Sequence, residues 1–124
     1  MRIIVLSILG FFLAFSSCQK DDETIVNKDG DIFYVKYEIS GNGTYGRFSN
    51  WSVTTPNRLY VNTGYQTRYW MQTYGPVNKG FNCEVKIDNY ISGSPSINIL
   101  VSKNNEPFAI VLTTSGKSAS YIVQ

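Results

Sequence analysis

The sequence predicts an all-β fold: a single antiparallel β-sandwich of seven or eight strands with an immunoglobulin-like architecture. Three observations support this class. Apolar and polar residues alternate with a period of two along most of the chain after position 32, as in half-buried strands. Turn-forming residues interrupt the alternation at intervals of roughly 8–12 residues. The chain has 124 residues, which favours one domain with one core.

The first strand is expected over positions 33–39, where apolar and polar residues alternate. Gly41-Asn42-Gly43 follows and predicts a β-hairpin, because Asn and Gly accept the positive φ angles of a tight turn. Aromatic and β-branched residues predict a second strand over 48–54, which Pro56-Asn57 ends. A short strand should begin at Leu59, and Gly64 should separate it from another over 65–73.

The second half of the chain repeats the pattern of short strands and turns. Gly75-Pro76 and Lys79-Gly80 bracket a turn before an alternating strand over 81–87. A loop over 91–96, a strand over 97–101 and a turn over 104–107 come next. A largely apolar strand over 108–113 then turns into the last strand, over 119–123. Cys83 falls on the apolar side of its strand, so it should behave as a small buried hydrophobe.

The amino terminus has the layout of a secretory signal peptide. Arg2 precedes an apolar run over 3–13 that is too short to cross a bilayer, which takes about 20 residues. Positions 13–18 resemble the lipobox of bacterial lipoproteins, with Phe15 where that family prefers Leu and Ser17 where it prefers Gly or Ala. The resemblance implies that residues 1–17 are removed and that Cys18 is acylated and anchored in the lipid bilayer. A plain secretory signal is the alternative.

Residues 18–31 are expected to form the lipidated Cys and a polar tether, and residues 32–124 the β-sandwich domain. The sequence directly after the Cys, Gln19-Lys20-Asp21-Asp22-Glu23, resembles the export signal of Bacteroidetes surface lipoproteins. This resemblance implies an outer-membrane lipoprotein displayed on the cell surface. A solvated linker is the alternative for the acidic run, and a periplasm-facing protein is the alternative for the location.

The composition argues against catalysis. The chain has no His, which removes the commonest general base and the commonest metal ligand. The carboxylates are scattered along the strands and form neither a catalytic pair nor a calcium loop. A formal charge of +2 without a basic cluster argues against nucleic acid. We therefore expect a non-enzymatic protein with no cofactor and no bound metal. The G-x-G-x-x-G match over 41–46 precedes a strand-like segment, which favours a hairpin over a dinucleotide site.

Aromatic residues interleaved with Arg and Gln are dense between Tyr45 and Tyr74. If the core side of the strand over 65–73 consists of Tyr65, Tyr69 and Met71, alternation leaves four side chains on the opposite face: Gln66, Arg68, Trp70 and Gln72. An exposed Trp70 could stack on a sugar ring while its neighbours donate hydrogen bonds. The alternative is that these aromatic residues cover sheet faces, as they commonly do in sandwiches.

The order of the segments 35–44, 81–87 and 115–123, including Tyr37-Glu38-Ile39-Ser40-Gly41, is similar to that in MmpS-like small membrane-associated β-sandwich proteins. The resemblance implies an immunoglobulin-like accessory domain of an envelope transporter. The chain departs from that family in its lipid anchor and in the lack of a second Cys to pair with Cys83. The expected function is a non-catalytic binding or accessory module for an envelope protein complex, a glycan or a host protein. A carbohydrate-binding module is the alternative.

Overall fold

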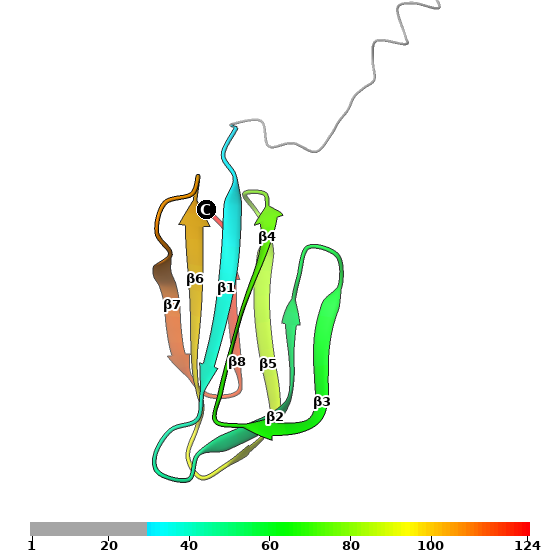
Figure 1. Ribbon diagram of the computed structural model, residues 1–124, viewed down its shortest axis with the longest axis vertical. Coiled ribbons are helices and arrows are strands. Elements are labelled where there is room, and N and C mark those ends of the chain that lie inside the picture. Colours follow the sequence, from blue (N-terminus) through cyan, green and yellow to red (C-terminus); the bar gives the residue numbers. More distant parts are fainter. Residues whose placement is uncertain (1–29) are drawn as a thin grey trace, which may run out of the picture. The chain divides into compact units, whose positions relative to one another are not determined.

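The computed structural model describes residues 30–124, and these form eight strands and no helix (Figure 1). The strands are β1 (Phe33–Ser40), β2 (Arg47–Thr54), β3 (Leu59–Thr67), β4 (Tyr69–Val77), β5 (Asn82–Ile91), β6 (Ser96–Lys103), β7 (Ala109–Ser115) and β8 (Ser118–Ile122). The all-β prediction is confirmed. The predicted signal peptide, the lipidated Cys18 and the tether up to position 29 lie outside the described residues.

The strands form two antiparallel sheets of four, with the orders β4-β1-β6-β7 and β3-β2-β5-β8. Two connections are hairpins within a sheet, β2–β3 and β6–β7, and the other five carry the chain from one sheet to the other. An immunoglobulin domain has the sheet orders ABED and CFG, which differ from these. The β-sandwich is therefore confirmed, whereas the immunoglobulin-like architecture is not.

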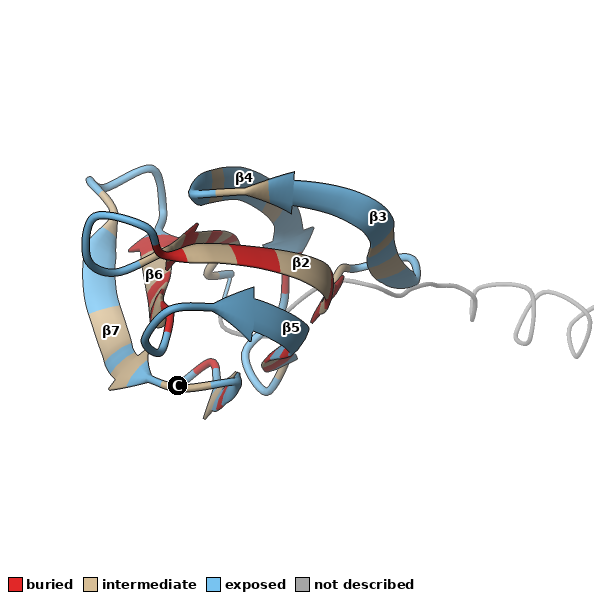
Figure 2. Cartoon of the chain, turned by 90° about the horizontal axis from the view of Figure 1, so that it is seen from below, coloured by how far each residue is buried: buried red, intermediate tan, exposed pale blue. Residues whose placement is uncertain are grey.

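The core lies between the two sheets and follows the period-two patterns of the inner strands. Every second residue of β1 from Phe33 to Ile39 is buried, because successive side chains of a strand point to opposite faces. The paired strands β2, β5 and β6 add further fully buried side chains, among them Phe48, Trp51, Val85 and Ile97. Cys83 is buried and unpaired, as predicted. Figure 2 shows the buried positions on β2 and β6 and the largely exposed β3 and β4.

The connection over 41–46 is a tight loop between the sheets, so the predicted hairpin is wrong. β1 and β2 are not paired with each other, and each belongs to a different sheet. Gly43 has a φ of 76°, as the Asn-Gly turn requires. A side chain at Gly46 would collide with the carbonyl of Asn42, and one at Gly41 with the carbonyl of Gly46. The glycines thus serve a sharp turn, and β2 follows them where a dinucleotide site would need a helix.

The boundary between β3 and β4 lies at Arg68, and the predicted break at Gly64 is wrong. β3 continues through Gly64, which has a φ of 86°, at a bulge where three residues of β3, 63–65, lie opposite the single Asn50 of β2. The side chain of Asn50 accepts a hydrogen bond from the backbone N–H of Gly64 at 2.7 Å. Gly64 therefore bends the strand without ending it, which is a common use of glycine in sheets.

The chain enters the domain beside the β6–β7 turn. Asn104 accepts a hydrogen bond from the backbone N–H of Ile32 at 2.9 Å and donates one to Asp31 at 2.9 Å. Lys103 lies 3.5 Å from the other Asp31 oxygen. These contacts hold the start of the domain, and β1 then runs beside the last residues of β4, with Phe33 opposite Val77.

Candidate functional site

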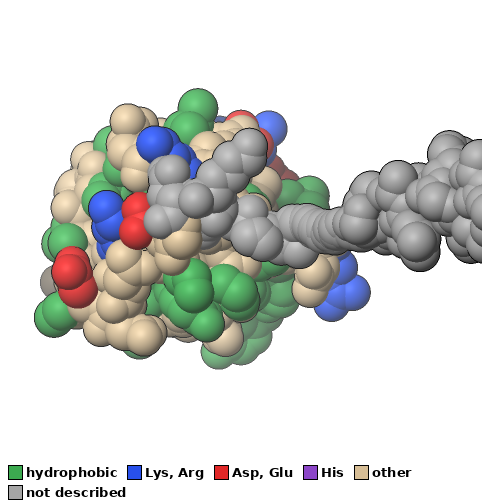
Figure 3. All heavy atoms as spheres, turned by 90° about the horizontal axis from the view of Figure 1, so that it is seen from above, with side chains coloured by type: hydrophobic (Ala, Val, Ile, Leu, Met, Phe, Trp, Pro, Cys, Tyr) green, Lys and Arg blue, Asp and Glu red, His purple; other side chains and the backbone are tan. Residues whose placement is uncertain are grey.

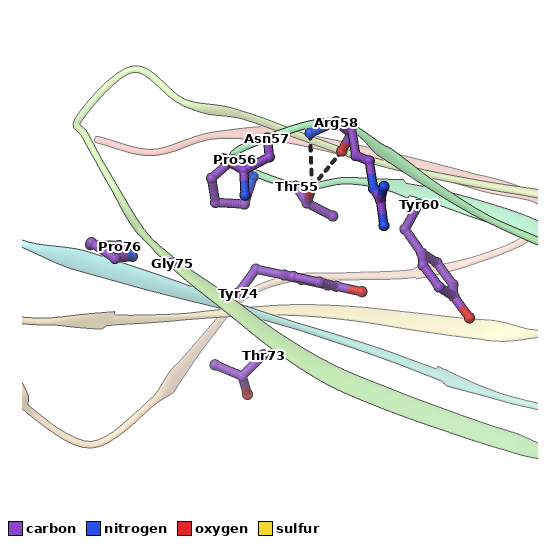
Figure 4. Close-up of a pocket in the computed structure, with 9 residues that line it drawn as sticks. All are labelled: Thr55, Pro56, Asn57, Arg58, Tyr60, Thr73, Tyr74, Gly75 and Pro76. Carbon is purple, nitrogen blue, oxygen red and sulfur yellow. Dashed lines mark hydrogen bonds between the residues drawn. The ribbon is translucent and has the colours of Figure 1, made fainter.

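The two strands at one side of the sandwich, β3 and β4, are consecutive in the chain but belong to different sheets and are not hydrogen-bonded to each other. They meet at Arg68, and a cleft of about 630 Å³ lies at their other end. We call it the edge cleft. It is lined by nine residues: Thr55, Pro56, Asn57, Arg58, Tyr60, Thr73, Tyr74, Gly75 and Pro76 (Figure 4).

Two tyrosines form the aromatic part of the edge cleft, and the core holds both of them from behind. Tyr60 stacks on Trp70 with 5.5 Å between ring centroids and 10° between ring planes. Trp70 in turn lies 5.7 Å from the fully buried Trp51. Tyr74 packs at 6.0 Å against Tyr37 of β1. Because buried rings fix these side chains, the aromatic lining is pre-formed.

The polar groups that the edge cleft offers to a ligand are the guanidinium of Arg58 and the hydroxyls of Tyr60 and Tyr74. The guanidinium of Arg58 extends from the β2–β3 turn toward the space beside Tyr60 and Tyr74 (Figure 4). Within residues 30–124, neither this guanidinium nor the two phenol hydroxyls make a hydrogen bond or ion pair. Thr55 fixes the turn itself, because its hydroxyl bonds to the backbone N–H and carbonyl of Arg58. The backbone is therefore held while the charged group is free to bind.

The electrostatics of the edge cleft are one-sided. Arg58 is a cation, and none of the other eight lining residues carries a carboxylate. Burial raises the pKa of Tyr74, and the nearby Tyr60 raises it further. The phenol of Tyr74 is therefore neutral near pH 7 and can donate or accept hydrogen bonds. The arrangement can hold a flat, hydroxyl-rich or negatively charged ligand.

The structure corrects the predicted orientation of the aromatic strand. Tyr65, Tyr69 and Met71 are 59%, 49% and 44% exposed, whereas Trp70 is half-buried and packs against the core. The pairing explains this, because Trp70 lies opposite the buried Ile39 of β1 and so shares its inward face. The strand restarts after Arg68, which reverses the alternation that was extrapolated from Tyr65.

The four residues predicted to share one binding face do not come together. Arg68 donates hydrogen bonds to the carbonyls of residues 43, 44 and 46 and so closes the β1–β2 loop. Gln66 lies opposite Ser49 on the outer face of the other sheet. Gln72 lies opposite Tyr37, on the same inward-facing side of β4 as Trp70, and is exposed. Among the four, Trp70 is nearest to the edge cleft, where it supports Tyr60 from behind.

Sequence reasoning included Arg58, Tyr60 and Tyr74 in the aromatic segment without assigning them to a site. The signal that could have identified them is a turn, Pro56-Asn57, followed by a cation and an aromatic residue two positions later. That signal places two residues on one side of the cleft. The partner side comes from β4, and no sequence pattern indicated that β3 and β4 face each other from separate sheets.

A second, smaller hollow of about 360 Å³ lies on β2 and β3 and is lined in part by Leu59, Val61 and Asp88. Next to it, Trp51 and Asn62 face each other across the two strands. The indole N–H and the amide oxygen are buried and have no hydrogen-bond partner within residues 30–124. Buried polar groups without partners usually lower the stability of a fold.

No group of three or more potential metal ligands occurs among residues 30–124. The same part of the chain contains no helix long and apolar enough to cross a bilayer. Comparison with known proteins found no matching family model, and no significant match among curated proteins or solved structures.

Proposed function

We propose that this protein is a cell-envelope lipoprotein whose β-sandwich is a non-catalytic binding or accessory module, and that the edge cleft is its binding site. The acyl group on Cys18 anchors it in the outer membrane, with the domain displayed at the cell surface. The observation that carries the proposal is the edge cleft itself, where core-supported tyrosines and the unpaired Arg58 face the same space. Pre-formed pockets with a few converging polar groups are typical binding sites.

The location half of the proposal is supported by the lipobox-like sequence before Cys18 and the acidic run after it. Growth with an alkyne-tagged fatty acid should label the wild-type protein and leave a Cys18→Ser variant unlabelled. Protease added to intact cells should then remove the domain if it is displayed at the surface. Release of soluble wild-type protein into the medium would contradict the anchor, and protection from protease would favour the periplasm-facing alternative.

The binding half has two candidate ligands, an envelope or host protein and a glycan. The phenol groups of Tyr60 and Tyr74 favour the glycan, because sugar rings pack on aromatic surfaces and their hydroxyls need hydrogen-bond partners. The carbohydrate-binding alternative thus moves from the predicted face with Gln66 to the edge cleft. On a glycan array, the full-length Tyr74→Ala protein should lose signals that a Tyr45→Ala protein keeps, because Tyr45 is 72% exposed and lies outside the cleft.

A further inference from the structure

We infer that the edge cleft selects an acidic saccharide, with Arg58 binding the sugar's carboxylate and Tyr74 packing against its ring. The inference rests on the proposed binding function and adds the ligand's charge to it. Its starting point is the contrast between the described Arg side chains near the aromatic residues, since some of them already have partners within the domain and Arg58 has none.

Arg68 and Arg47 illustrate the contrast. The guanidinium of Arg68 donates to three backbone carbonyls, and that of Arg47 donates to the Gly46 carbonyl at 3.2 Å. The guanidinium of Arg58 donates to no group in the described part of the chain, although the backbone of Arg58 is fixed by Thr55. A guanidinium held at the mouth of a cleft with its donors unused is suited to bidentate binding of a carboxylate.

The surroundings of Arg58 point to a sugar as the carrier of that carboxylate. The ring of Tyr74 and the phenol hydroxyl of Tyr60 line the same space, whereas the side chain of Thr73 points to the other side of β4 (Figure 4). A uronic acid matches this set, because it joins one carboxylate to a ring with several hydroxyls. An uncharged sugar would leave the guanidinium without a counter-charge, and an acidic group without a ring would leave the tyrosines unused.

The apolar end of the domain adds a boundary to the site. Pro56 and Pro76 line both the edge cleft and a neighbouring hollow of about 240 Å³ with Phe81 and Val77. Figure 3 views the molecule from this end and shows hydrophobic side chains gathered there. Hydroxyl-rich chain extensions are therefore expected to leave the cleft on the side of Tyr60, away from these prolines (Figure 4).

The test compares two oligosaccharides of equal length on the full chain in detergent, measured by calorimetry: a trigalacturonate and the neutral galactotriose. We expect the wild type to bind trigalacturonate at least about tenfold more tightly at low salt, the change typical of one charge-assisted contact. The Arg58→Gln variant should lose about this factor for trigalacturonate and keep its affinity for galactotriose within about twofold. Lys86→Gln, which removes the same charge on the outer face of β5, is the matched control and should match the wild type.

The outcomes separate the inference from the proposed function. Equal affinity for the two sugars, or an Arg58→Gln protein that keeps the acidic preference, would overturn the acidic-saccharide inference while glycan binding stands. Binding of neither sugar by the wild type would overturn the inference and the carbohydrate function together. A thermal melt shows whether each variant is folded, and a loss of both affinities in a Tyr74→Ala protein that still melts cooperatively would support the edge cleft as the site.

Discussion

Arg58 and Arg68 both lie in the aromatic segment, and replacing each of them by Gln separates a ligand-binding role from a structural one. Arg68 bonds to the carbonyls of Gly43, Thr44 and Gly46 at 2.8, 2.9 and 3.1 Å. Arg58 has no such contact within the described domain. Replacing each by Gln removes the same charge and the same donor fork. We expect Arg68→Gln to destabilise the fold and to leave ligand binding intact, and Arg58→Gln to do the reverse.

The magnitude for Arg68→Gln follows from its three hydrogen bonds. A net contribution of about 0.5–1.5 kcal/mol for each of the three bonds would give about 1.5–4.5 kcal/mol in total. Solvent reaches this exposed loop and offers replacement partners, and Gln can restore one bond, so a loss of about 2 kcal/mol in the free energy of unfolding is expected. Arg58→Gln should change that free energy by less than about 0.5 kcal/mol, as for most surface substitutions.

Urea unfolding followed by tryptophan fluorescence measures both variants, because Trp51 and Trp70 lie in or against the core. For Arg68→Gln, the midpoint should fall while the dependence on urea stays unchanged. Equal midpoints for the two variants would refute the structural role of Arg68. A selective loss of trigalacturonate binding in Arg68→Gln would instead restore it as a ligand-binding residue.

Three further substitutions test the interior and the outer face. Tyr37→Phe should lower the free energy of unfolding by about 1–2 kcal/mol, because the phenol of this buried residue donates to the Thr54 carbonyl at 2.7 Å and so links the two sheets. Urea unfolding measures this loss. A loss under about 0.5 kcal/mol would show that the hydrogen bond between the sheets does not stabilise the fold. Hydrogen bonds from Asn98 and then Tyr69 lower the pKa of Glu38 below its ordinary value of 4.5. The ionised Glu38 thus stabilises the fold above pH 4.5, and this contribution is lost as the pH falls through the lowered pKa. On acidification the wild type should therefore lose more stability than Glu38→Gln. Equal losses in the two proteins would contradict a lowered pKa for Glu38. Burial raises the pKa of Cys83 to about 11. In a Cys18→Ser protein, where Cys83 is the remaining thiol, a thiol reagent at pH 8 should therefore modify the protein only after unfolding. Rapid labelling of the native protein would show that the thiol is accessible.

The strands could be predicted because each one carries its own evidence. The alternation over 33–39 becomes β1 with its buried odd positions, and the turn over 104–107 joins β6 to β7 as expected. Local patterns do not determine which strands pair. Gly41-Asn42-Gly43 has the chemistry of a hairpin, yet the chain crosses to the other sheet there, because β1 finds its partners in β4 and β6. Long-range packing chose between two uses of the same turn.

The site was less predictable for the same reason. The segment between positions 45 and 74, which is dense in Tyr, Trp and Arg, supplies most of the residues that line the edge cleft. Choosing the residues required the phase of the alternation, and that phase changes at Arg68, where β3 ends and β4 begins in the other sheet. A period-two pattern carried from Tyr65 through this boundary therefore placed Trp70 on the wrong face.

The two strands beside the edge cleft, β3 and β4, are edge strands, so each exposes one side that is unpaired within the described domain. Such edges add strands from other proteins unless their regular pairing is interrupted. β4 carries Gly75-Pro76 just before its last residue, Val77, where Pro lacks the N–H donor, and β3 is bent at Gly64. Both interruptions disfavour an extended peptide, which would need a continuous ladder of backbone hydrogen bonds. A ligand that uses side-chain groups such as Arg58 and Tyr74 has no such requirement, and this favours a saccharide over a peptide strand.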